Sequence, residues 1–123
     1  MKKVFLLEDV EPNAVLIACF LELSGWDQLE RATTLREAER HIDAADMADY
    51  AAWIIDIELP DGESYGILDM LKARQARNIF AYTVRCSPSE VVWLQARGFD
   101  HVYPKPLRLG AFAEHFEHAV EAA

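Results

Sequence analysis

Cysteine, basic residues and long apolar runs are all scarce in this sequence, and each scarcity disfavours a class of protein. The two cysteines, Cys19 and Cys86, lack the CxxC spacing of zinc and redox sites. Both lie among apolar residues, where we expect reduced, half-buried thiols. Twelve Lys and Arg residues stand against 21 Asp and Glu, a formal net charge of −9. This acidity repels a phosphate backbone, so we expect no direct binding of nucleic acid.

The N-terminal stretch MKKVFLLEDV contains an apolar run, VFLL, that stops at an acidic pair. Such a run is too short for the apolar region of a signal peptide or for a membrane span. We therefore expect a cytoplasmic protein without membrane contact. With 123 residues, 52% of them hydrophobic, residues 1–123 are predicted to form a single domain with a core of its own and no separate output domain.

Short apolar runs bounded by acidic or turn residues predict strands buried on both faces of a parallel sheet. The clearest are Lys3 to Leu7, followed by Glu8-Asp9, and Ala51 to Ile55, followed by Asp56. Further strands are predicted around Trp26 to Arg31, at Ile79 to Tyr82 and at Phe99 to Tyr103.

Helical spacing of apolar residues fills the segments between these strands. Helices are predicted from Pro12 to Leu23, from a cap at Thr33 or Thr34, over Ile67 to Leu71, over Val91 to Ala96 and over Leu109 to Val120. The end of the second helix, within Asp43 to Asp49, stays open. Five strands alternating with five helices predict an α/β fold, with a doubly wound parallel sheet covered on both faces.

Chemically active side chains follow four of the five predicted strands. They are Glu8-Asp9, Asp56, Thr83 and Lys105. In open parallel sheets the ligand site lies beyond the carboxyl ends of the strands. If the strands concerned are neighbours, these side chains converge on one pocket.

The predicted pocket combines three carboxylates with one lysine and one hydroxyl. Oxygen donors alone suit a hard cation such as Mg²⁺, which offsets the repulsion among Glu8, Asp9 and Asp56. Asp56 can then act as a nucleophile toward a phosphoryl group and form an aspartyl phosphate. Lys105 supplies positive charge to the phosphoryl oxygens, and the Thr83 hydroxyl can donate a hydrogen bond to one of them.

This ordered set resembles the receiver domains of two-component response regulators, in particular single-domain receivers of the chemotaxis-regulator type. Their pattern is an acid pair after the first strand, Asp at the end of the third, Thr or Ser after the fourth and Lys-Pro after the fifth, here Lys105-Pro106. The resemblance implies a flavodoxin-like fold with strand order 2-1-3-4-5, and suggests a cis Lys-Pro bond. It also implies Mg²⁺ bound by Asp9, Asp56 and the backbone carbonyl of Glu58, and we count Glu8 as a fourth residue of this metal site.

The same resemblance implies partners and a mode of action. The phosphoryl donor would be a histidine kinase or a histidine phosphotransfer protein. Phosphorylation would switch the face built from the fourth helix, fifth strand and fifth helix, which would bind a downstream protein or drive homodimerisation. Self-phosphorylation and autodephosphorylation, both dependent on Mg²⁺, would be the only reactions of such a domain, so we do not expect an enzyme in the usual sense.

Three positions depart from the family pattern. The usual switch aromatic is replaced by Val102, with His101 and Tyr103 on either side. Val84, after Thr83, is larger than the usual Ala or Gly and would narrow access to the phosphoryl group. Ser64 stands where a glycine is common.

Two other functions remain open. One is a pseudo-receiver, a constitutive protein-binding scaffold that is never phosphorylated, which Val102 and Val84 favour. The other is a metal-dependent phosphatase, in which Glu58 would be the second acid after the nucleophile; the position of Asp56 on the third strand and the lack of a cap domain disfavour it.

Two further pairs of side chains carry separate expectations. Glu58 and Arg85 can form an ion pair across the mouth of the pocket and slow autodephosphorylation by hindering the attacking water. His115 and His118 are three residues apart, a spacing that can bind metal, but no other ligand accompanies them in the sequence. We therefore expect these histidines to be solvated helix residues.

Overall fold

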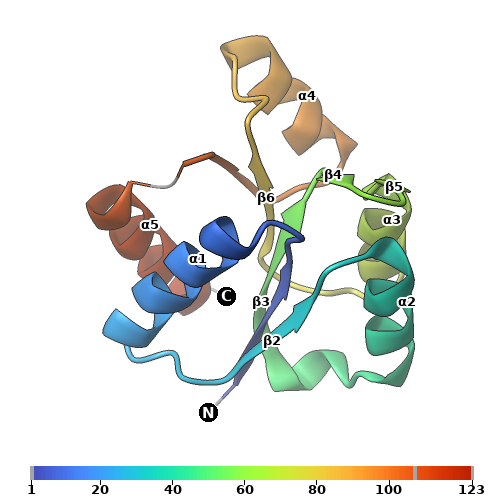
Figure 1. Ribbon diagram of the computed structural model, residues 1–123, viewed down its shortest axis with the longest axis horizontal. Coiled ribbons are helices and arrows are strands. Elements are labelled where there is room, and N and C mark those ends of the chain that lie inside the picture. The colour runs from blue at the N-terminus through green and yellow to red at the C-terminus, as the bar shows by residue number, and fades with distance from the viewer. Residues whose placement is uncertain (1, 107, 123) are drawn as a thin grey trace.

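The protein was analysed as a computed structural model that describes residues 2–106 and 108–122, and its centre is a five-stranded parallel sheet (Figure 1). The strands in sheet order are β2 (Leu29–Ala32), β1 (Lys3–Leu7), β3 (Tyr50–Asp56), β6 (Ile79–Thr83) and β7 (His101–Pro104). Counted along the chain, this is the order 2-1-3-4-5. The predicted fold is therefore confirmed.

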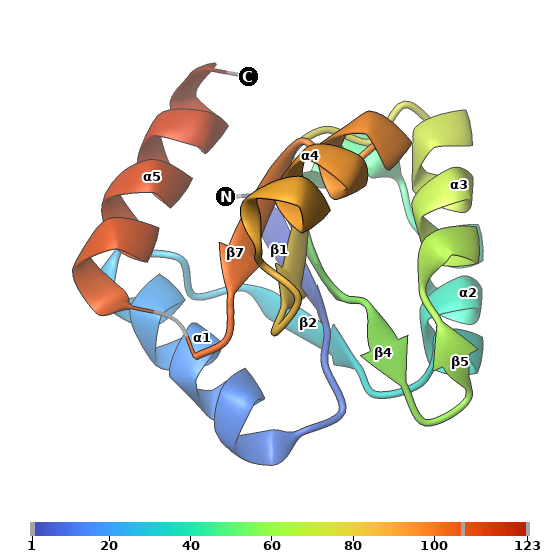
Figure 2. The ribbon, with the colours of Figure 1, turned by 90° about the horizontal axis from the view of Figure 1, so that it is seen from above.

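Helices cover both faces of this sheet (Figure 2). They are α1 (Glu11–Leu23), α2 (Leu35–Ala44), α3 (Tyr65–Ala73), α4 (Pro88–Arg97) and α5 (Leu109–Ala122). Helices α1 and α5 pack on one face, and α2, α3 and α4 pack on the other. Within the described residues, no helix combines the length and apolar character needed to cross a membrane.

The central strand β3 is shielded from solvent along its whole length. All seven residues of β3 are buried, and Trp53 at its middle is fully inaccessible to solvent. Alternate residues of the strand enter the two cores, because successive side chains point to opposite faces. Because helices cover both sides of this strand, its side chains on both faces have to be apolar. This explains the continuous apolar run from which the strand was predicted.

Element boundaries differ from the prediction at the two outer strands. The strand predicted around Trp26 to Arg31 spans Leu29–Ala32 instead, because the Trp26 amide closes the end of α1 by donating to Leu21 and its ring packs edge-on against Phe116. The last strand begins at His101, since Gly98, with φ 137°, ends α4 and Phe99 belongs to the turn that follows.

Some short elements were not predicted from the sequence. Strands β4 (Glu58–Leu59) and β5 (Gly62–Glu63) form a two-stranded hairpin directly after β3. The open segment after α2 contains a 3₁₀ turn, η1 (Met47–Asp49), capped by the Asp46 side chain. The expected half-burial holds for Cys86 but is wrong for Cys19, which lies on the exposed side of α1.

Candidate functional site

The parallel register brings the predicted site residues to one edge of the sheet. Strands β1, β3 and β6 are direct neighbours, with Leu7 opposite Ile55 and Asp56 opposite Tyr82. Residues at or just after the ends of these strands therefore share one edge. Lys105 directly follows β7, the strand next to β6. It reaches the same edge because its backbone amide donates to the carbonyl of Thr83 at 3.0 Å.

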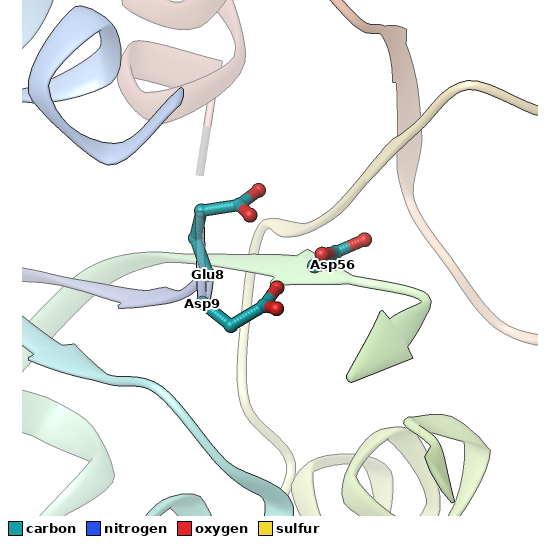
Figure 3. Close-up of side chains that lie close together, drawn as sticks. All are labelled: Glu8, Asp9 and Asp56. Carbon is teal, nitrogen blue, oxygen red and sulfur yellow. The ribbon is translucent and has the colours of Figure 1, made fainter. Parts of the chain in front are cut away.

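Three carboxylates face one another at this edge (Figure 3). Glu8, Asp9 and Asp56 each offer an oxygen within 4.8 Å of the others. Glu8 is fully buried and Asp56 is 5% exposed, whereas Asp9 is partly accessible. Buried like charges at this spacing need positive charge close by.

Lys105 supplies that charge to two of the three acids. Its Nζ lies 2.6 Å from Oε2 of Glu8 and 3.0 Å from Oδ2 of Asp56, and 4.9 Å from the centre of the Tyr82 ring. The other oxygen of Glu8 accepts the backbone N–H of Val10 at 3.0 Å. Glu8 is thus held by the protein at both oxygens.

Asp9 differs from Glu8 in this respect. Within the part of the chain that the structure describes, its carboxylate makes no hydrogen bond or ion pair, although it lies beside two buried acids. An unpaired, partly accessible carboxylate close to the oxygens of Glu8 and Asp56 fits a Mg²⁺ site. Asp56 itself accepts the backbone N–H of Glu58 at 3.3 Å.

Burial sets the protonation behaviour of Asp56. Desolvation raises its pKa to about 6, with a further increase from the charge of Glu8, while the hydrogen bond from Lys105 acts in the opposite direction. For Lys105, burial works to lower the pKa, but the bonds to Glu8 and Asp56 outweigh it and the pKa is raised. At neutral pH the site therefore holds an ionised Asp56 beside a charged lysine.

Asp56, Thr83 and Lys105 line one small pocket. The pocket has a volume of about 250 Å³ and is lined by Val10, Asn13, Asp56, Glu58, Thr83, Val84 and Lys105. This volume is below the range of about 300–1,000 Å³ usual for small-molecule sites, so the pocket suits a group such as phosphoryl rather than a metabolite. Thr83 is 3% exposed, and its hydroxyl accepts the Arg85 amide at 3.0 Å.

Two residues of this pocket, Val10 and Asn13, were not among the predicted site residues. From the sequence alone, Asn13 is only a residue at the start of a predicted helix. Its position four residues after Asp9, at the beginning of a helix that follows a site strand, is the signal that could have identified it.

The predicted contact between Glu58 and Arg85 is confirmed. The Arg85 guanidinium forms an ion pair with the Glu58 carboxylate and lies 3.8 Å from Glu63 on strand β5. Both side chains of the Glu58–Arg85 pair are about half exposed. The pair therefore stands at the mouth of the pocket rather than inside it.

The departures from the family pattern now have structural descriptions. Val102 packs on the α4 side of β7, whereas Tyr103 is buried on the α5 side against Phe80 and Phe112. Val84 is 73% exposed at the rim of the pocket and does not fill it. Ser64 has φ −86°, a conformation that needs no glycine. The bond between Lys105 and Pro106 is cis, as expected.

Comparisons with known proteins find likeness in structure only. No protein-family model matches the sequence, and no curated protein matches it. Among solved structures, the non-phosphorylated HemR receiver domain from Leptospira biflexa superposes with a TM-score of 0.81 at 23% identity, over 98% of this chain and 94% of that one. A two-component response regulator from Clostridium difficile gives 0.84 at 19% identity, over 98% and 97%.

A third structure is the receiver domain of a sensor histidine kinase from Pseudomonas aeruginosa PAO1, which has a magnesium ion coordinated in its active-site cleft. It superposes with a TM-score of 0.80 at 19% identity, over 98% of both chains. The likeness in each case extends over nearly the whole chain. This chain thus has the fold of the receiver domains of two-component signalling proteins.

Proposed function

We propose that this chain is a receiver domain that accepts a phosphoryl group on Asp56 from a histidine kinase or a histidine phosphotransfer protein. The observation that carries the proposal is the meeting of Asp56, Thr83 and Lys105 in one small pocket beside an acidic cluster. Each of the three comes from a different strand end, so their convergence is a property of the fold and not of a local motif.

The chemistry follows from the positions of the side chains. A carboxylate oxygen of Asp56 attacks the phosphorus of the donor, and the bond from phosphorus to the donor's leaving atom breaks as the new P–O bond forms. Lys105, already 3.0 Å from Asp56, remains close enough to pair with the transferred group. The Thr83 hydroxyl, which accepts the Arg85 amide, keeps its own proton to donate to a phosphoryl oxygen.

Asp9, Asp56 and the backbone carbonyl of Glu58 are the groups that would hold Mg²⁺. When bound, the ion neutralises charge on the phosphoryl oxygens and on the carboxylates. Glu8 has a different task in this proposal: with both oxygens engaged by Lys105 and the Val10 amide, it positions the lysine.

We expect a partner protein to bind the phosphorylated form. Val92 and Trp93 on α4 are 66% and 53% exposed, and Val84 in the loop before α4 is 73% exposed. Large apolar side chains left this exposed are common on protein-binding surfaces. We propose that residues 1–123 act in the cytoplasm as one interaction module, with α4, β7 and α5 forming the face that phosphorylation changes.

The test is the intact mass of the protein after incubation with acetyl phosphate and Mg²⁺. We expect the wild type to gain one phosphoryl group, the gain to vanish with EDTA, and Asp56→Asn to show none. The matched control is Asp61→Asn, which alters an exposed carboxylate in the adjoining hairpin and should leave phosphorylation intact.

A negative result has a definite interpretation. If the protein gains no phosphoryl group and does not respond to beryllofluoride with Mg²⁺, the receiver proposal fails and the constitutive scaffold is favoured. Addition that persists in Asp56→Asn would instead place the acceptor on another residue.

A further inference from the structure

An aromatic ring lies beside the acidic cluster at the strand ends. In the parallel register, Asp56 at the end of β3 is opposite Tyr82 on β6. The Tyr82 side chain belongs to the core between the sheet and helices α1 and α5, and the residue is 1% exposed. A ring that is almost free of water therefore lies next to the proposed phosphoacceptor.

The ammonium of Lys105 lies over this ring. Its Nζ is 4.9 Å from the centre of the Tyr82 ring. An ammonium within about 6 Å of the ring centre is attracted to the negative face of an aromatic ring. The same nitrogen pairs with Glu8 at 2.6 Å and with Asp56 at 3.0 Å. Among the described residues, two carboxylates and one aromatic face thus surround this ammonium.

A position in the core does not by itself require a tyrosine. The hydrophobic effect has no direction, so leucine or methionine would also keep this position free of water. An aliphatic side chain lacks the negative charge on the face of a ring, which is what attracts a cation. This attraction is stronger where the cation has lost its water, and the Lys105 side chain is only 11% exposed. The ring therefore offers the lysine an interaction that an aliphatic residue cannot replace.

The contact with Tyr82 also differs from the ion pair with Asp56 in its response to phosphorylation. When Asp56 becomes an acyl phosphate, its negative charge moves from the carboxylate to the phosphoryl oxygens, and Lys105 has to exchange one anionic partner for another. The face of the ring is unchanged by this reaction, and so is the carboxylate of Glu8. Tyr82 and Glu8 can therefore hold the ammonium while its third partner changes.

We propose that Tyr82 is a positioning residue: the face of its ring holds the Lys105 ammonium beside Asp56, where the ammonium meets the incoming phosphoryl group. Tyr82 acts through Lys105, since it is not among the described residues that line the pocket beside Asp56. The effect of Tyr82 on phosphorylation rests on the proposed function, whereas the holding of the ammonium does not. Two measurements distinguish these two parts.

The first measurement is proton NMR of the unphosphorylated chain, without a phosphodonor. The face of an aromatic ring shields protons that lie above it, so the methylene protons next to the Lys105 ammonium should resonate upfield of those of the exposed Lys2 and Lys72. Tyr82→Phe should keep this shift and Tyr82→Leu should lose it. The matched control is Tyr103→Leu, which removes the neighbouring ring in the same core and should keep the shift. A wild type in which Lys105 resonates with Lys2 and Lys72 would overturn the proposal.

The second measurement is the rate of phosphorylation by acetyl phosphate at saturating Mg²⁺. We expect Tyr82→Phe to react nearly as fast as the wild type and Tyr82→Leu to react about tenfold more slowly. Pentafluorophenylalanine in place of Tyr82 keeps a ring of similar volume but reverses the charge on its face. This protein should be as slow as Tyr82→Leu, and its comparison with Tyr82→Phe does not depend on how leucine packs.

Equal rates with phenylalanine and pentafluorophenylalanine at this position would overturn the proposal, because the ring would then matter only through its volume. If the wild type accepts no phosphoryl group at all, the proposed function fails. In that case the upfield shift of Lys105 and its loss in Tyr82→Leu still decide whether Tyr82 holds the ammonium.

Discussion

Asp56 has to be ionised to act as a nucleophile, but its burial makes the ionised form unfavourable. Its pKa of about 6 lies well above the ordinary value of an aspartate, mainly because of burial. A folded state that binds this proton more tightly than the unfolded chain loses stability as pH rises from about 4 through about 6. In buffer without divalent cations, Asp56→Asn should therefore raise the free energy of unfolding at pH 7, by up to about 3 kcal/mol.

Urea unfolding of both proteins at pH 4 and pH 7 measures this effect. The gain should be present at pH 7 and should be much smaller at pH 4, where the carboxyl group is protonated in the folded state and about half protonated in the unfolded chain. Asp61→Asn provides the comparison, because that exposed carboxylate accepts the backbone amides of Leu35 and Arg36 and has a lowered pKa. A gain of similar size in Asp61→Asn would show that net charge, not the buried site, is responsible.

The ion pair of Arg85 with Glu58 makes a kinetic prediction at the same scale. If the pair hinders the water that attacks the phosphoryl group, Arg85→Ala should hydrolyse its aspartyl phosphate faster. An exposed pair contributes up to about 1 kcal/mol, so the increase should be up to about fivefold. The decay of phosphorylated protein after removal of the donor measures the rate.

Arg97→Ala is the control for this experiment. Arg97 pairs with Asp69 through two bonds on the exposed side of α3 and α4, without touching Glu58. Its loss should leave the lifetime unchanged. Equal lifetimes in wild type and Arg85→Ala would remove the pair from the mechanism.

Residue identities at the site were more predictable than residue roles. Asp56, Thr83 and Lys105 stand at strand ends, and the alternation of strands and helices is enough to place strand ends together. The engagement of both Glu8 oxygens was not predictable, because it depends on where the chain turns at Val10 and on the path of Lys105. The contact of Lys105 with the Tyr82 ring depends on long-range packing in the same way.

At the level of elements, the end of α3 carries local strain. The amides of Gln75 and Ala76 donate to Lys72 and Leu71, a Schellman motif in which Gln75 takes φ 59°. A residue with a Cβ adopts this left-handed conformation at a cost of about 1 kcal/mol or more. Gln75→Gly should therefore raise the free energy of unfolding by about 0.5–1 kcal/mol, part of the gain being offset by the greater freedom of the unfolded chain.

The end of α1 provides the reciprocal experiment. There the amides of Gly25 and Trp26 donate to Glu22 and Leu21 in the same motif, with Gly25 at φ 88°. Gly25→Gln should destabilise the protein by a similar amount, measured by chemical unfolding. Opposite signs for the two substitutions would establish backbone strain as the cause, whereas stabilisation by both would contradict it.

The type of each element was predictable because burial determines the pattern of apolar residues. The residues at which elements begin and end were less predictable. Apart from Lys3 at the start of β1 and Asp56 at the end of β3, these two strands are apolar, since helices cover both their faces. The strand β2 lies at an edge and is only half buried, and its sequence, LERA, carries little apolar signal. The hairpin of β4 and β5 has two residues in each strand, which is too short for any periodic pattern to appear.

At the level of the whole molecule, the folded state concentrates acidic charge that the unfolded chain disperses. Because the carboxylates of Asp9 and Asp56 come together only on folding, Mg²⁺ should bind the folded state and raise the unfolding temperature. At a concentration about 100 times the dissociation constant, the stabilisation is about 2.7 kcal/mol. For a domain of this size that corresponds to a shift of about 10 °C.

Thermal unfolding with and without Mg²⁺, at constant ionic strength, measures this shift. Asp9→Asn should lose most of it, because its carboxylate is the one without a protein partner among the three described. A shift of equal size in Asp9→Asn would show that the ion acts by general screening of the net charge of −9.

The seven residues of β3 separate the chemical edge of the sheet from the opposite edge by about 20 Å. The loop before this strand, with Asp46 on the surface, contributes no side chain to the small pocket beside Asp56. A fluorescent protein inserted at that loop would leave the reactive groups untouched while remaining attached to the strand that ends in Asp56. Because the reactive groups lie at one edge of the sheet and this loop at the opposite edge, the loop is a suitable insertion point for a biosensor.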